Sequence, residues 1–408
     1  MKIILAILLS GCIYPVFGQD AYSSYRLADS LYRVQDYKAS ARATMVGLNA
    51  DKIKDNPTRS LHAAGSFARA GIPDSAFAVL SKLSASNRIS PAAVKGMATN
   101  KDLAVLQTDA RWKPLFDKLT KKAAGNYKVE EIIYGHKDGL AMSMLQLSPK
   151  GKPNGRAIIR VVAGSWYSSI SSAESYVTGS YDYLQKGFRV YHVMVGSNPR
   201  YNIEEQIGDV KRAIRFIRYN AERFGVSPNH IGLEGGSAGG HLTLAVGTAN
   251  DLVDSTAADP VDRVSSRVQS MAVQYPPTDI LNWGGKGLNM VSARQMLEYN
   301  KVWGAFDFHT LNVNNMTLVP VTDTAERNKI GMAVSPVYSV TPDDPPVFII
   351  HGDADATVPL QQSLIFVERL KAAGINYKFV VKPGAGHNYL EMLPEWLDAA
   401  TWFLETLF

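Results

Sequence analysis

Ser237 stands in a sequence that could make its hydroxyl a nucleophile. It is the centre of a Gly-x-Ser-x-Gly motif whose glycines are Gly235 and Gly239. A short apolar strand is predicted before the motif, at 230–233, and a helical run after it, at 242–249. A serine in such a turn has its hydroxyl pushed out above the sheet, and side chains at the flanking positions would collide with neighbouring backbone. The motif therefore predicts a serine that can attack a carbonyl group.

An acid and a base follow Ser237 in two later loops. The apolar run 347–350 predicts a buried strand, and Asp353 and Asp355 come just after it. Open α/β sheets place their working groups at this end of a strand. His387 follows another predicted strand, 377–381, in a glycine-rich loop. The chain order serine, aspartate, histidine is the order described for α/β-hydrolases.

These three residue types have complementary roles in ester or amide cleavage. A serine hydroxyl is a poor nucleophile at neutral pH until a neighbouring imidazole removes its proton. His387 would take that proton and later give it to the leaving group. A carboxylate would hold the ring in the correct tautomer and stabilise the imidazolium. The residues alone leave both Asp353 and Asp355 as candidates for the carboxylate.

Residues 128–408 resemble the α/β-hydrolase fold, and most closely bacterial carboxylesterases of the hormone-sensitive-lipase-like and feruloyl/acetyl-xylan-esterase-like groups. Those groups share a Gly-x-Ser-Ala-Gly-Gly-His motif, a His-Gly-x-x-Asp-x-x-Val-Pro loop and a Gly-x-x-His loop, all of which occur here. The resemblance implies that Ser237 is the nucleophile and His387 the base. It selects Asp355 as the acid, because the pattern puts the carboxylate three residues before Val358.

The loop that would bind the oxyanion departs from the pattern of these esterases. That loop usually reads His-Gly-Gly-Gly-Trp, whereas 162–166 reads Val-Ala-Gly-Ser-Trp after the predicted strand 157–161. The donors are backbone N–H groups, so a changed side chain does not abolish them. We expect the N–H groups of Gly164, Ser165 and Ala238 to form the oxyanion hole. Loss of one such donor lowers the rate about 10²–10³-fold.

The substrate is expected to lie against Trp166, Gly236 and Tyr275 beside the serine. His241 and His351 are interpreted as structural residues. No zinc signature of the His-Glu-x-x-His type is present, so neither a metal nor another cofactor is expected.

Composition excludes several other classes. The formal net charge of +6 comes from scattered Lys and Arg, which indicates a solvated surface and no nucleic-acid site. The only cysteine is Cys12, which excludes disulfides and a cysteine nucleophile from a form that lacks it. After the start of the chain, no run of 18 apolar residues occurs, so no transmembrane span is expected.

The first 18 residues read as a secretory signal peptide, with a charged tip, an apolar stretch and small residues before a cleavage site at Gly18. Cys12 lies in a lipoprotein-like box, but an apolar segment follows it, which favours cleavage over a lipid anchor. A periplasmic or secreted protein is therefore expected.

Two domains are predicted after the signal peptide. Residues 19–125 show helical spacing and tetratricopeptide-like segments, so a small all-α domain is expected, either a spacer or a binding site for a protein partner. Residues 126–408 alternate strands and helices, which predicts a doubly wound, mostly parallel α/β-hydrolase sheet. Residues 276–336 lack a strand pattern and are rich in aromatics, which suggests an insertion or lid over the active site.

The function that fits best is a secreted serine esterase acting on small-molecule or glycan esters. A prolyl-oligopeptidase-like peptidase is an alternative, although the N-terminal block lacks propeller-like repeats and Ala238 stands where those peptidases usually have an aromatic residue. A second alternative is an envelope interaction protein with weak hydrolase activity.

Overall fold

A computed structural model describes residues 21–53 and 55–407, so the predicted signal peptide and Cys12 lie outside the described residues. The chain divides into two compact units, the first ending at Lys122 and the second covering Ala123–Phe408. No helix in the described part of the chain combines the length and the apolarity that a bilayer crossing needs.

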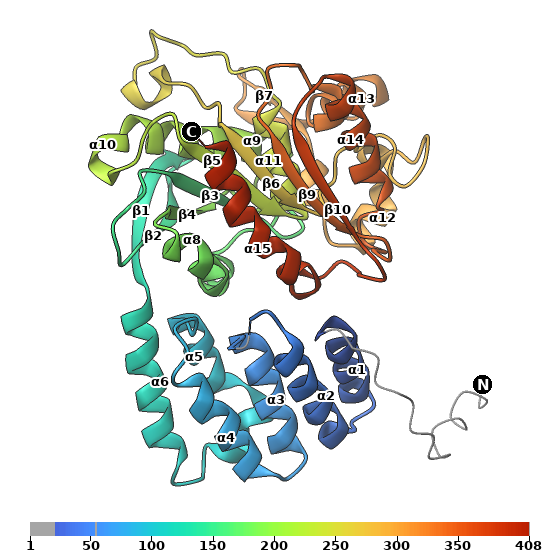
Figure 1. Ribbon diagram of the computed structural model, residues 1–408. Coiled ribbons are helices and arrows are strands. Elements are labelled where there is room, and N and C mark those ends of the chain that lie inside the picture. Colours follow the sequence, from blue (N-terminus) through green and yellow to red (C-terminus); the bar gives the residue numbers. More distant parts are fainter. Residues whose placement is uncertain (1–20, 54, 408) are drawn as a thin grey trace, which may run out of the picture. The chain divides into compact units, whose positions relative to one another are not determined.

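The first unit consists of helices (Figure 1), and the first four pack against their neighbours in chain order. They are α1 (Ala21–Arg33), α2 (Tyr37–Ala50), α3 (Pro57–Arg69), α4 (Pro73–Leu83), α5 (Pro91–Thr99), the 3-10 helix η1 (Lys101–Leu106) and most of α6 (Trp112–Asn126), whose last four residues belong to the second unit. Prolines occupy the first position of α3, α4 and α5, where no hydrogen bond is lost. Side chains of Asn56 and Ser90 cap α3 and α5.

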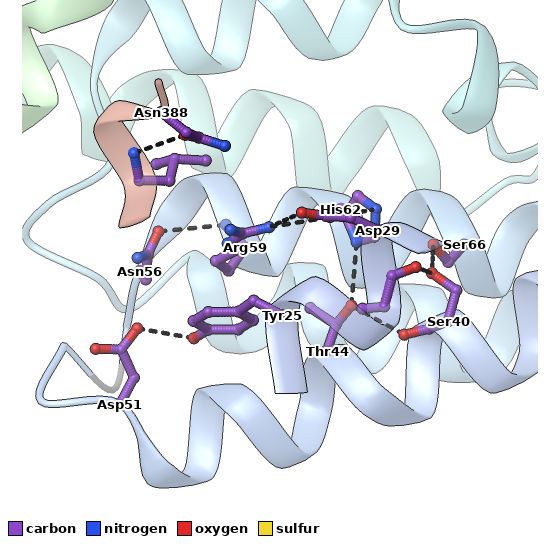
Figure 2. A network of polar contacts seen from close by, with 12 residues as sticks. Tyr25, Asp29, Ser40, Thr44, Asp51, Asn56, Arg59, His62, Ser66 and Asn388 are labelled. Atoms are coloured by element: carbon purple, nitrogen blue, oxygen red, sulfur yellow. Dashed lines mark hydrogen bonds and ion pairs between the residues drawn. The ribbon is translucent and has the colours of Figure 1, made fainter. Parts of the chain in front are cut away.

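A polar network ties α1, α2 and α3 together (Figure 2). Arg59 donates to Asp29 at 3.1 and 3.3 Å, and Tyr25 donates to Asp51 at 2.7 Å. His62 is 3.0 Å from the Thr44 hydroxyl. Burial lowers the pKa of His62 despite the nearby Asp29 carboxylate. These contacts fix a three-helix array, while its likeness to tetratricopeptide repeats stays a prediction.

The second unit is built on an eight-stranded sheet in the order β1-β2-β4-β3-β5-β6-β9-β10. The strands are β1 (Lys128–Lys137), β2 (Leu140–Ser148), β3 (Ala157–Val162), β4 (Arg189–Met194), β5 (Ile231–Gly236), β6 (Ser270–Gln274), β9 (Val347–Gly352) and β10 (Tyr377–Lys382). The β1–β2 and β2–β4 pairs are antiparallel and the rest are parallel. This sheet confirms the predicted doubly wound α/β-hydrolase class.

Helices cover both faces of this sheet. Figure 1 shows α15 (Tyr389–Thr406) crossing one face, where it also contacts α8 (Tyr181–Gln185). On the other, α11 (Ala238–Gly247) lies against β5, β6 and α9 (Ile203–Tyr219). Val210, Ile214 and Ile217, at steps of three and four along α9, form a buried apolar stripe. Outside the segment 276–336, the other elements of the second unit are α7 (Ile170–Ser175), η2 (Tyr176–Ser180), α10 (Ala221–Phe224), η3 (Pro260–Arg263), η6 (Pro336–Tyr338) and α14 (Gln361–Ala372).

The segment 276–336 contains two strands that its sequence pattern did not predict. It holds η4 (Met290–Ser292), α12 (Arg294–Tyr299), η5 (Trp303–Phe306), the strands β7 (His309–Asn312) and β8 (Thr317–Pro320), and α13 (Thr324–Ala333). The two short strands form an antiparallel hairpin. Phe306 and Phe308 are fully buried, so these aromatics contribute to the core of the second unit. The role of the segment as a lid stays a prediction.

Candidate active site

Ser237 occupies a strained turn between β5 and α11. Its φ is 53° and its ψ is −126°, a conformation that L-residues rarely adopt outside functional sites. A Cβ at Gly235 would approach the carbonyl carbon of Gly239 to 2.4 Å, and one at Gly239 would approach the Val161 carbonyl oxygen to 2.5 Å. Both glycines are therefore required by backbone packing, as the motif predicts.

Ser237, His387 and Asp355 come together at the carboxyl ends of β5, β9 and β10. The Ser237 hydroxyl is 2.8 Å from Nε2 of His387. Nδ1 of His387 donates to Oδ2 of Asp355 at 2.7 Å. The His387 side chain is 19% exposed and that of Asp355 is fully buried, so one end of this chain of hydrogen bonds is open to a substrate.

The loops that carry the acid and the base are bonded directly to each other. Ala354 N–H donates to the Ala385 carbonyl at 3.0 Å, and a Cβ at Gly352 would come within 2.1 Å of that same carbonyl oxygen. The close approach is possible only because residue 352 has no side chain. This contact fixes the spacing between Asp355 and His387.

The environment of Asp355 keeps it ionised. Burial alone would raise the pKa of this carboxyl, but hydrogen bonds from His351 and His387 hold it well below its usual range. Oδ1 also accepts from the N–H groups of Thr357 and Val358 at 2.8 and 2.9 Å. The carboxylate can therefore stabilise a positive charge on His387.

Asp353, the other candidate, has a different environment. Its Oδ1 accepts from the N–H of Gly384, and its own N–H donates to the Lys382 carbonyl. The geometry therefore supports Asp355 over Asp353 as the partner of His387.

His351 supports Asp355, a contact that sequence reasoning missed. Nε2 of His351 donates to the Val358 carbonyl at 2.9 Å and lies 3.4 Å from Oδ2 of Asp355. Nδ1 accepts from the Ser363 hydroxyl at 2.8 Å. The spacing of four residues between His351 and Asp355 was the only signal for this contact.

The three expected oxyanion donors do not share one environment. Gly164 N–H donates to the Tyr167 carbonyl at 2.9 Å in a small turn, so this group already has a partner. No acceptor is found within the described residues for the N–H groups of Ser165 and Ala238. Ser165 has a positive φ of 51°. Ser165 and Ala238 therefore stay the candidate oxyanion donors, and Gly164 does not.

Trp166 does not line the cavity beside Ser237, contrary to its expected place against the substrate. The cavity has a volume of about 220 Å³, and its lining includes Gly236 and Tyr275 but not Trp166. Trp166 is buried and packs edge-on against Phe306. Its indole N–H donates to Nδ1 of His241 at 3.2 Å. Trp166 therefore packs into the core and stabilises the loop 162–166 on the side away from the cavity.

Two further residues define the site. The Tyr275 ring lies 4.2 Å from the His387 ring, centroid to centroid, and so restricts the position of the imidazole. His241 is fully buried and also donates from Nε2 to the Val334 carbonyl at 2.7 Å, which agrees with its interpretation as a structural residue. Among the described residues no group of three or more His, Cys, Asp or Glu side chains could hold a metal ion.

Arg160 and Glu234 form a buried ion pair that sequence reasoning also missed, and Arg160 lines the same cavity as Ser237. They are direct partners in the register of β3 and β5. Nε of Arg160 donates to Oε1 of Glu234 at 2.6 Å, and the Tyr183 hydroxyl donates to Oε2. Burial alone would lower the pKa of Arg160, but Glu234 raises it above its usual range. The only signal in the sequence was a charged residue in each of two otherwise apolar strands.

Residues 145–370 match the BD-FAE family, which is more than half of the chain. The chain belongs to the BD-FAE family. Esterase LipC of Mycobacterium tuberculosis is 26% identical to this BD-FAE protein over 74% of the chain and 69% of LipC. Acetylxylan esterase of Xylanibacter ruminicola is 35% identical over 24% of the chain and 20% of that enzyme.

A solved structure has the same fold as the BD-FAE protein. The acetyl ester-xyloside bifunctional hydrolase of Caldicellulosiruptor lactoaceticus superposes with a TM-score of 0.52 and 22% identity, over 68% of this chain and 96% of that one. Family and relatives together identify the BD-FAE protein as a serine hydrolase of the carboxylic ester hydrolase class.

Proposed function

We propose that this protein is a secreted serine esterase in which Ser237, His387 and Asp355 form the catalytic triad. The observation that carries the proposal is the pair of hydrogen bonds that joins the three side chains, at 2.8 and 2.7 Å. The serine side of this pair borders a cavity, so a substrate carbonyl can reach the hydroxyl.

Acylation follows from this arrangement. The Ser237 hydroxyl oxygen attacks the ester carbonyl carbon while Nε2 of His387 takes its proton. The negative oxygen that results is stabilised by the N–H groups of Ala238 and Ser165. When the carbon–oxygen bond breaks, His387 gives the proton to the departing alcohol, and the acyl group stays on Ser237.

Deacylation reverses these roles. His387 takes a proton from a water molecule, whose oxygen attacks the acyl carbon, and then returns the proton to the Ser237 oxygen. The ionised Asp355 stabilises the imidazolium in both halves of the reaction. Because Gly164 N–H is bound to Tyr167, we leave Gly164 out of the oxyanion hole.

Acyl groups on plant polysaccharides and small esters are the proposed substrates. Support comes from the acetylxylan esterase relative and from the hydrolase that shares the fold. The predicted signal peptide supports a periplasmic or secreted location, and a protein partner of the helical unit stays a proposal.

Steady-state hydrolysis of 4-nitrophenyl acetate tests the proposed nucleophile. Ser237→Ala is expected to lower kcat by about 10⁶-fold, the loss typical of such a serine. Ser255→Ala, an exposed serine, is the matched control and should match the wild type. A Ser237→Ala protein of wild-type fold and activity would refute the proposal. A parallel panel of 4-nitroanilides separates an esterase from a peptidase, since only a peptidase cleaves the amides efficiently.

A further inference from the structure

The cavity beside Ser237 is lined by polar side chains that the triad does not use. Arg160, Gln274, Tyr389 and Trp396 come from β3, β6 and α15 and all border it. Arg160 is 4% exposed, and Gln274 and Trp396 are 3% exposed. These side chains therefore lie in the wall of the second unit, next to the reacting serine.

Each of these four side chains has a buried polar atom without a partner. Within the described residues, no hydrogen-bond partner at normal distance is found for Nη1 of Arg160, Oε1 of Gln274, the Tyr389 hydroxyl or Nε1 of Trp396. The Arg160 and Tyr389 side chains interact with each other, which opposes the rise that burial causes in the pKa of Tyr389. Buried polar groups are nearly always satisfied, and an unmet one opposes folding. Four such atoms around one cavity indicate a place prepared for a polar ligand.

Two of these atoms lie side by side at a gap left by a glycine. A Cβ at Gly179 would come within 2.5 Å of the Tyr389 hydroxyl and 3.1 Å of Nη1 of Arg160. The Tyr176 ring closes this end of the cavity, with its centroid 6.3 Å from that of Tyr389. The Arg160 and Tyr389 donors therefore lie close together at this end of the cavity.

The charge of Arg160 is already balanced. Its Nε and Nη2 lie 2.6 and 2.5 Å from Oε1 of Glu234, so only Nη1 remains for a ligand. A carboxylate ligand could not bind the guanidinium through two parallel hydrogen bonds. The Gln274 oxygen, which can only accept, would repel a carboxylate.

We propose that this cavity binds a neutral, hydroxyl-bearing part of the substrate next to the scissile ester, and this inference rests on the proposed function. A hydroxyl both donates and accepts, so it can satisfy Gln274 as well as Arg160 and Trp396. An alkyl group could not form a hydrogen bond with any of these four atoms. A cavity of about 150 Å³ holds a benzene ring, so about 220 Å³ accommodates a hydroxylated group of similar size.

Matched esters test this selectivity on both sides of the scissile bond. The alcohol series compares the acetate of a hydroxylated six-membered ring, a methyl xylopyranoside, with cyclohexyl acetate. The acyl series compares 4-nitrophenyl 3-hydroxybutyrate with the butyrate and the negatively charged hemisuccinate. Each kcat/KM is divided by the hydroxide-catalysed rate of the same ester, which removes differences in intrinsic reactivity.

The wild type is expected to prefer the hydroxylated ester by about 10²-fold in one of the two series, since sites built to hydrogen-bond a hydroxyl reject analogues that lack it. That series identifies which part of the ester enters the cavity. Tyr389→Phe and Trp396→Phe, which each remove one polar atom and keep an aromatic ring, should each lower this preference about tenfold. Tyr219→Phe, an exposed tyrosine outside the cavity, is the matched control and should keep the wild-type preference.

Equal rates for hydroxylated and apolar esters in both series would overturn the inference while leaving the esterase intact. A higher rate for the hemisuccinate than for the hydroxybutyrate would also overturn it, in favour of an anion site. If no ester is hydrolysed, the proposed function fails and the inference falls with it.

Discussion

At the scale of the residue, the loop after β9 holds two carboxylates, and only one of them contacts His387. Asp355 is 2.7 Å from His387, whereas Asp353 bonds to backbone in the neighbouring loop. Both aspartates follow the same strand, so a comparison of the two separates a catalytic effect from a general effect of removing charge.

Asp355→Asn is expected to lower kcat by about 10⁴-fold, because an amide at this position favours the wrong histidine tautomer. Asp353→Asn should change kcat by less than about tenfold. Hydrolysis of 4-nitrophenyl acetate by the two purified variants measures both. Equal losses in the two variants would contradict the assignment of Asp355.

Residues that belong to short sequence motifs could be predicted from the sequence, whereas residues outside such motifs could not. The cluster of Ser237, Asp355 and His387 could be predicted because turns at strand ends constrain the neighbouring glycines and prolines. Arg160 and Glu234 were missed because their pairing depends on which strands lie next to each other, and β3 and β5 are far apart in the chain. Trp166 was misplaced because a motif does not reveal which way a side chain faces.

At the scale of the element, the turn from β5 into α11 needs glycines that fit against β3. A methyl group at Gly239 would meet the Val161 carbonyl oxygen, which belongs to the backbone of a central strand and cannot move away cheaply. The turn and Ala238, the proposed oxyanion donor, would shift together.

Gly239→Ala is therefore expected to lower kcat/KM by more than about 10²-fold, the effect of a misplaced oxyanion donor, and to lower the melting temperature. Gly208→Ala is the control, because a Cβ at this position in α9 meets nothing within 4 Å. It should leave activity unchanged and stabilise the helix by up to about 1 kcal/mol. Steady-state kinetics and thermal unfolding test both; similar behaviour of the two variants would contradict this account.

Most strands of the hydrolase sheet were predictable because they are buried on both faces and read as continuous apolar runs. The β7–β8 hairpin was not, because its strands have four residues each and are largely exposed, which leaves no apolar pattern. The oxyanion loop was predictable only in part. Its composition indicated backbone donors, but the Gly164–Tyr167 pairing is set by the local turn.

At the scale of the whole molecule, buried histidines link the stability of the second unit to pH. Burial, together with Arg160, lowers the pKa of His192 to about 3. Burial lowers the pKa of His241 to about 4. Both histidines are neutral in the folded state at pH 5, whereas an unfolded histidine titrates near 6.5. The unfolded state therefore binds more protons below pH 6.5, and stability falls as the pH decreases.

Each of these histidines is expected to remove about 0.7 kcal/mol of unfolding free energy per pH unit near pH 6.5, and about 1.4 kcal/mol per pH unit near pH 5. Urea unfolding followed by tryptophan fluorescence at several pH values measures this slope. His241→Gln should lower the slope near pH 5 by about 1.4 kcal/mol per pH unit, which corresponds to one proton taken up on unfolding. This change in slope is expected even if the variant is less stable at pH 7. An unchanged slope in this variant would contradict a neutral, buried His241.

The central claim, that Ser237 is the residue acylated in turnover, is tested most directly by covalent labelling. The protein is incubated with a fluorophosphonate and digested, and the modified peptide is sequenced by mass spectrometry. We predict one phosphonate per chain, on Ser237, with labelling absent in Ser237→Ala and strongly slowed in His387→Ala. Label on another residue, or a folded wild type that takes up none, would contradict the account.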